Sequence, residues 1–115
     1  MSEKITLYLP GTLAGNHTLE IAADRNWKIT HVSAVSSNDS DALLSLGNDA
    51  SAVAYMVATV IGDSNVPAEL DRDDFVNDQY PTHAKGDVFV ITLDYDGDGG
   101  TAADDVVIVI TIDSY

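Results

Sequence analysis

The chain has 115 residues and no cysteine, and its 5 basic residues stand against 19 acidic ones, for a formal net charge of −14. A chain of this length predicts a single domain over 1–115, and the lack of cysteine excludes disulfides, thiolate metal sites and thiol chemistry. A surface this acidic repels phosphate backbones and anionic lipids. We therefore expect neither a nucleic-acid partner nor a membrane partner.

Asp supplies 16 of the 19 acidic residues and Glu only 3. Because Asp favours turns and forms helices poorly, the charge is expected in loops and not on helical faces. The opening residues show no apolar stretch of a secretory signal, and no run reaches the length of a membrane span. We therefore expect a soluble protein that is made in the cytoplasm.

Apolar residues alternate with polar ones in seven segments, which is the pattern of half-buried strands. In chain order these segments are 4–10, 17–22, 27–35, 42–47, 53–62, 87–95 and 105–112. Clusters of Gly, Asn, Asp, Ser and Pro separate them. Seven or eight short strands with such punctuation predict an all-β fold, a jelly-roll-like antiparallel β-sandwich. Strict alternation in 27–35 would place on one face Trp27, Ile29, His31, Ser33 and Val35.

Residues 67–86 break this pattern. They hold two of the three prolines and four acids between 69 and 74, and they show no period of two. We expect one long connection with a helical turn over 68–75, which crosses between two sheets as in a Greek key or jelly roll. Connections of this length often carry function.

The last segment, "VVIVITI" (106–112), is apolar on both faces and would aggregate at an exposed sheet edge. Asp104, Asp105 and Asp113 flank it in the manner of gatekeeper residues. The pattern predicts a central strand with the core on one face and a neighbouring chain or loop on the other. It therefore favours a homo-oligomer.

The stretch "DYDGDGGTAADD" (94–105) has the spacing of a calcium-binding loop. Asp94, Asp96 and Asp98 alternate, Gly99 permits a sharp turn, and Asp105 holds the twelfth position. Alternating carboxylates can converge on calcium, which takes six to eight oxygen ligands. Asp105 is shorter than the Glu usual at that position. Strands, not helices, flank the loop, so it is not an EF-hand.

The alternative for this stretch is an acidic hairpin turn. Gly97, Gly99 and Gly100 would then supply the positive φ angles that such turns need. The sequence leaves both interpretations open.

A catalytic site is not expected. "GDSN" (62–65) resembles the nucleophile block of the Gly-Asp-Ser hydrolases, with Asp78 and His83 as candidate partners of Ser64. That fold needs an α/β sheet and a much longer chain, and the spacing of the later Asp and His does not match. We therefore predict no enzymatic activity and no catalytic residues.

The aromatic residues offer a candidate surface for stacking on sugars: Trp27, Tyr8, Tyr55, Tyr80 and Tyr115. Packing in the core or at an interface is the other role open to them. Together with the acidic loop they define one candidate function, a calcium-dependent carbohydrate-binding β-sandwich module.

A resemblance favours a different function. The runs "ADRNWKITHVSAVSSNDSDALLSLGN" and "GDVFVITLDYDGDGGTAADDVVIVITI" resemble small β-sandwich virion proteins of tailed bacteriophages, which include jelly-roll head decoration (cement) proteins. The likeness covers residues 20–112 and is one of pattern and size. It carries no diagnostic motif, so no functional residue can be transferred from the family.

The resemblance implies a non-enzymatic structural protein made in the host cytoplasm and located on the outer capsid surface of a virion. Such a protein would bind the major capsid protein and stabilise the shell, as a dimer or trimer on the particle. The high net charge would keep it soluble before assembly.

Overall fold

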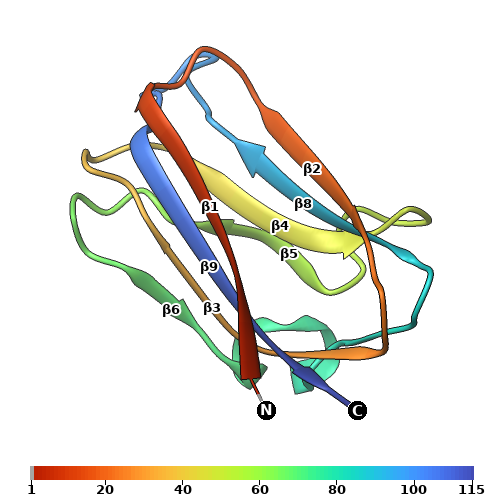
Figure 1. Cartoon of the computed structure of the whole chain (residues 1–115). Coiled ribbons are helices and arrows are strands. Elements are labelled where there is room, and N and C mark those ends of the chain that lie inside the picture. Colours follow the sequence, from red (N-terminus) through yellow and green to blue (C-terminus); the bar gives the residue numbers. More distant parts are fainter. Residues whose placement is uncertain (1) are drawn as a thin grey trace.

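The computed structural model describes residues 2–115 as two antiparallel β-sheets packed face to face (Figure 1). Sheet A has the strand order β1-β9-β3-β6, with β7 also paired to β3, and sheet B has the order β2-β8-β4-β5. The strands are β1 (Ser2–Thr12), β2 (His17–Ala22), β3 (Trp27–Val35), β4 (Leu43–Asn48), β5 (Met56–Val60), β6 (Ala68–Leu70), β7 (Thr82–His83), β8 (Val88–Asp94) and β9 (Asp104–Ser114). Two 3-10 turns, η1 (Arg72–Asp74) and η2 (Val76–Asp78), complete the elements. None of these residues forms a helix of the length and apolarity needed to cross a membrane.

The strand pairing follows the order of a jelly roll. The first long strand pairs with the last, β1 with β9, and the pairing continues inward as β2 with β8, β3 with β6 and β4 with β5. All of these ladders are antiparallel. Eight strands wound in this way over two sheets form the double Greek key of a jelly roll. The predicted jelly-roll-like sandwich is therefore confirmed, and all seven predicted strands are present.

The segment 67–86 is more structured than its sequence suggests. The expected helical turn within 68–75 is present only as the 3-10 turn η1, the edge strand β6 precedes it, and β7 adds a short pairing with β3. Strand β6 has three residues, of which only Leu70 is buried. Three residues are too few to show a period of two, which is why the pattern did not reveal this strand.

Strand β3 departs from strict alternation. Its register with β9 shifts between Ile29 and His31, as in a β-bulge, where one strand gains an extra residue. Trp27 and Ile29 face the core, but beyond the shift the buried residues are Val32 and Ala34. The predicted face assignment is therefore wrong after Ile29, and the outer face receives His31, Ser33 and Val35.

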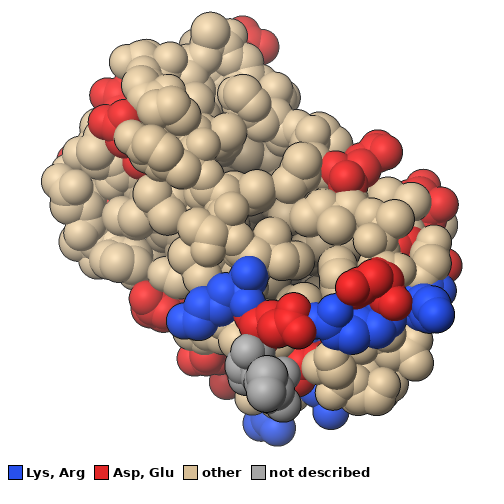
Figure 2. Space-filling view, in the orientation of Figure 1, with Lys and Arg blue, Asp and Glu red and all other residues tan. Residues whose placement is uncertain are grey.

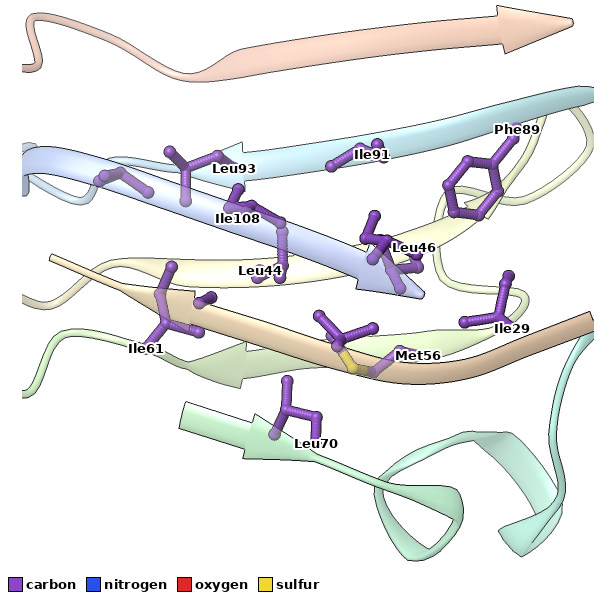
Figure 3. Packing of buried hydrophobic residues seen from close by; sticks show 14 of the residues in the cluster. Ile29, Leu44, Leu46, Met56, Ile61, Leu70, Phe89, Ile91, Leu93 and Ile108 are labelled. Carbon is purple, nitrogen blue, oxygen red and sulfur yellow. The ribbon is translucent and has the colours of Figure 1, made fainter. Parts of the chain in front are cut away.

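The core lies between the sheets and draws large apolar side chains from both of them (Figure 3). The largest fully buried apolar side chains are Phe89, Ile29, Leu44, Leu46, Met56, Ile61, Ile91, Leu93, Ile108, Ile110 and Val32. Phe89 also contacts the rings of Trp27, Tyr55 and the buried His83, with ring centroids 5.6–6.1 Å apart. This aromatic cluster fills the end of the core nearest the chain termini.

Replacing Phe89 with Ala is expected to lower the free energy of unfolding by about 3–5 kcal/mol, because it removes a fully buried ring and leaves a cavity. Urea unfolding monitored by circular dichroism measures the change. Val57→Ala is the control, since Val57 is 58% exposed on β5 and should change stability by only about 0.5 kcal/mol. Equal effects of the two substitutions would contradict this packing.

Candidate functional site

The outer face of sheet A is uncovered, and its centre is largely β-branched. Alternate residues of β9 are buried in the core, while Val107 and Val109 are partly exposed on the outer face. Within residues 2–115, no element forms a further layer over them (Figure 1). The prediction that β9 is a central strand is confirmed. No loop of the described chain covers its other face, so cover by a neighbouring chain stays a prediction.

Cross-strand neighbours extend this apolar surface. Val107 lies opposite Tyr8 of β1 and Val35 of β3, and Tyr8 is 59% exposed. In the next row along the strands, Val109 lies between a threonine and a serine. We call the resulting uncharged surface the sheet A face; it consists of Thr6, Tyr8, Ser33, Val35, Val107 and Val109.

Basic residues lie at only one end of the strands, whereas carboxylates lie at both ends. Eight carboxylates lie in or beside the connections at one end of the sandwich, which we call the acidic end: Asp39, Asp41, Asp63, Asp94, Asp96, Asp98, Asp104 and Asp105. All five basic residues, Lys4, Arg25, Lys28, Arg72 and Lys85, belong to the opposite end, which they share with carboxylates such as those of Glu3, Asp24, Asp73, Asp87 and Asp113. Figure 2 shows the basic side chains gathered toward that end of the molecule. A partner therefore meets a different electrostatic potential at each end.

Most of the predicted calcium loop is held by hydrogen bonds to its own and neighbouring backbone. Asp94 Oδ1 accepts from the Asp96 backbone N–H at 3.0 Å, and Asp41 Oδ2 accepts from the Thr101 backbone N–H at 2.8 Å. Partial desolvation, together with the nearby charges of Asp94, Asp41 and Asp98, raises the pKa of Asp96. Asp41 was not among the predicted ligands, because only the fold brings the β3–β4 connection against this loop.

Asp105, the fourth predicted ligand, makes separate contacts. Its Oδ1 accepts from the Gly11 backbone N–H at 2.7 Å, and its Oδ2 accepts from the Ser37 hydroxyl at 3.2 Å. It adopts φ 47° beside the point where the β1–β9 register shifts. Among the residues from 2 to 115, no three or more His, Asp or Glu side chains are arranged to hold a metal ion. Calcium binding by Asp94, Asp96, Asp98 and Asp105 stays a prediction of the sequence.

A charged cluster borders the sheet A face on β3. His31 Nδ1 lies 2.8 Å from Asp71 Oδ1, and its Nε2 contacts Glu69. The hydrogen bond to Glu69 raises the pKa of His31. Partial burial opposes this shift, and the hydrogen bond to Asp71 adds to it. The contact with His31 in turn lowers the pKa of Glu69. The Ser33 hydroxyl donates to Glu69 at 3.2 Å and not to His31, so the cluster is an ion-pair network and not a nucleophile with its base.

The residues that resemble a hydrolase triad are far apart. Ser64 lies at the acidic end, where its backbone N–H donates to Asp39. His83 is fully buried at the other end; its Nε2 donates to the Asp87 carbonyl at 2.9 Å, and its Nδ1 accepts from the Tyr55 hydroxyl at 2.6 Å. The fold therefore does not bring Ser64 and His83 together.

The five aromatic residues proposed for sugar stacking also separate. Trp27 is in the core, Tyr8 is on the sheet A face, and Tyr115 lies beyond the end of β9. Tyr55 and Tyr80, however, line one cavity beside η2. Their sequence separation hides this pairing, because it depends on how the long connection folds against the β4–β5 loop.

Comparison of the chain with family models, with curated proteins and with solved structures finds no match in any of the three. The functional argument therefore depends on the geometry of these residues.

Replacing His31 with Gln is expected to produce a pH-dependent loss of stability. A raised histidine pKa contributes stability that is fully present below the unfolded value of about 6.5 and is lost as pH rises through the folded pKa. Glu69 limits the stabilisation at low pH. Its lowered pKa contributes stability that is lost as pH falls through the folded pKa of Glu69. Urea unfolding of both proteins from about pH 4 to pH 9 measures the difference. A difference that does not vary with pH would rule out this account.

Replacing Asp105 with Ala is expected to destabilise the fold by about 1–2 kcal/mol, because it removes the acceptor of the Gly11 N–H and a residue type that tolerates positive φ. Asp105→Asn keeps the acceptor and should retain most of the stability. Thermal unfolding in EDTA and in calcium measures both. A calcium-dependent stabilisation that Asp105→Asn abolishes would instead identify Asp105 as a metal ligand.

Proposed function

We propose that this protein is a non-enzymatic structural component of a phage virion, a jelly-roll decoration (cement) protein that binds the major capsid protein on the outer shell and stabilises it. The observation that carries the proposal is the sheet A face. Exposed apolar patches on soluble proteins commonly mark protein–protein contacts. This one lies on a regular sheet surface at the centre of the molecule.

The distribution of charge supports the same surface. Two copies of a protein with a net charge of −14 repel one another, as do the protein and any acidic shell. The six residues of the sheet A face carry no charge. Lys4, Lys28 and His31 lie on the same side of the sheet toward its other end, as do Glu69 and Asp113, which pair with Ser33 and Lys28. Contact through this face therefore avoids the eight carboxylates of the acidic end.

The proposal includes self-association. Decoration of a shell with local symmetry axes places copies beside one another, so we expect a dimer or trimer on the particle. The acidic end then projects beside the contact surface and not into it, since it lies at the ends of the strands (Figure 1).

Co-sedimentation with purified expanded shells of the corresponding phage tests the proposal. Val109→Asp should weaken binding about ten-fold or more, because it places an unpaired charge in a desolvated contact. Val60→Asp is the matched control: Val60 is 66% exposed on β5 of the other sheet, and the substitution adds the same charge. Wild-type protein that does not bind the shells, or equal losses in both variants, would refute the proposal.

A further inference from the structure

The long connection between β6 and β8 forms a shallow cavity against the β4–β5 loop. Its volume is about 260 Å³, and none of its lining residues is charged: Ala54, Tyr55, Val76, Asn77, Gln79, Tyr80, Pro81 and Thr82. The lining thus offers two phenol rings, two carboxamides and one hydroxyl. None of these residues belongs to the sheet A face.

Tyr55 forms one wall of the cavity, and contacts with buried core residues hold its side chain in place. The Tyr55 hydroxyl donates to the buried His83, whose other ring nitrogen donates to the Asp87 carbonyl. The Tyr55 ring also stacks on Phe89, with centroids 6.1 Å apart, and its backbone carbonyl accepts from the Val76 N–H at 2.9 Å. The cavity therefore has one wall that is ordered before any ligand arrives, which lowers the cost of binding.

The opposite rim presents polar side chains that make no hydrogen bond within the described chain. Asn77 and Asp78 are consecutive residues with φ of 62° and 53°, a left-handed conformation that Asn and Asp tolerate better than other non-glycine residues. Within the described residues, the carboxamides of Asn77 and Gln79 and the hydroxyl of Tyr80 make no hydrogen bond. The Tyr80 side chain is also prominent, at 42% exposure.

We propose that this cavity binds one neutral sugar residue. The C–H face of a pyranose ring packs on a phenol ring, here that of Tyr80 or Tyr55. Each carboxamide offers both a donor and an acceptor, as sugar hydroxyls require, and Asn77 and Gln79 place two of them at the rim. A charged ligand would lose hydration here without gaining an ion pair, so the uncharged lining selects a neutral one.

This binding is independent of calcium and goes beyond the proposed role on the shell. The cavity is lined by residues of 54–55 and 76–82, at the end of the sandwich where β8 begins, and the acidic loop 94–105 follows the other end of β8. The seven residues of β8 separate the two by about 20 Å. An ion held in the acidic loop could not coordinate a sugar in the cavity.

Titration of ¹⁵N-labelled protein, monitored by NMR, tests the inference. The probes are the methyl glycosides of glucose, galactose and mannose, and N-acetylglucosamine, each to about 10 mM in EDTA. At least one should shift the amide signals of residues 54–55 and 76–82 in a saturable way, and calcium should not change its affinity. If none of the four shifts these signals, or if the shifts need calcium, the inference is wrong.

Matched variants locate the site. Tyr80→Ala should weaken binding about ten-fold, while Tyr8→Ala, which removes an exposed tyrosine of the sheet A face, should have no effect. Asn77→Gly preserves the left-handed backbone and removes only the carboxamide, so it should weaken binding several-fold without unfolding the chain. Its control is Asn65→Gly, at another left-handed asparagine, of φ 54°. Unchanged binding in both Tyr80→Ala and Asn77→Gly would overturn the assignment.

Discussion

The position of β9 is the constraint on which the rest of this structure depends. A strand that is apolar on both faces cannot stay at an edge of a sheet in water, because its unpaired backbone and its side chains would recruit other chains. Here β9 lies between β1 and β3, and its ladder with β1 begins at Ser2 opposite Asp113. Its buried residues fill the core, while Val107 and Val109 leave an apolar surface that the described chain does not cover. Closure of the fold and the candidate contact surface thus have the same origin.

The acidic end illustrates how a high net charge can arise from loop geometry. Asp39 and Asp41 each accept a hydrogen bond from a backbone N–H of another connection, and Asp105 at the start of β9 accepts one from Gly11 near the end of β1. The uncharged side chain of Asn38 likewise accepts a hydrogen bond from the Asp104 backbone N–H. The loops therefore require a short acceptor and not a charge. Carboxylates in this role accumulate negative potential at one end of the sandwich. That potential restricts the surfaces through which acidic partners can approach.

The sequence predicted the strands well and their contacts less well. Segments such as 17–22 and 27–35 match β2 and β3 because their alternation extends over six to nine residues. Strand β6 is too short to show a period, and the register shift after Ile29 reverses the faces of the rest of β3 in a way that composition does not reveal. The continuous apolar run 106–112, not alternation, predicted β9 as a central strand, because both of its faces are apolar.

The candidate sites were predictable only where their residues are close in sequence. Asp94, Asp96 and Asp98 come together because one short loop holds them, whereas Asp105 is drawn away by Gly11 and Ser37. Asp41 joins that loop from more than fifty residues away. Tyr55 and Tyr80 share a cavity only because the connection after β6 folds back over the β4–β5 loop. Contacts between distant connections depend on how the jelly roll is wound, and the local sequence pattern does not reveal that winding.

The pairing of the first strand with the last also determines how the molecule can be joined to others. Because Ser2 lies opposite Asp113, both ends of the chain leave the sandwich side by side, at the end that holds the basic residues (Figure 1). A reporter protein or displayed peptide fused at either terminus would emerge at that one pole. The eleven-residue span of β1, about 35 Å, would separate it from the acidic end. A short linker between the two termini would also connect them without crossing either sheet, so the fold is suited to circular permutation.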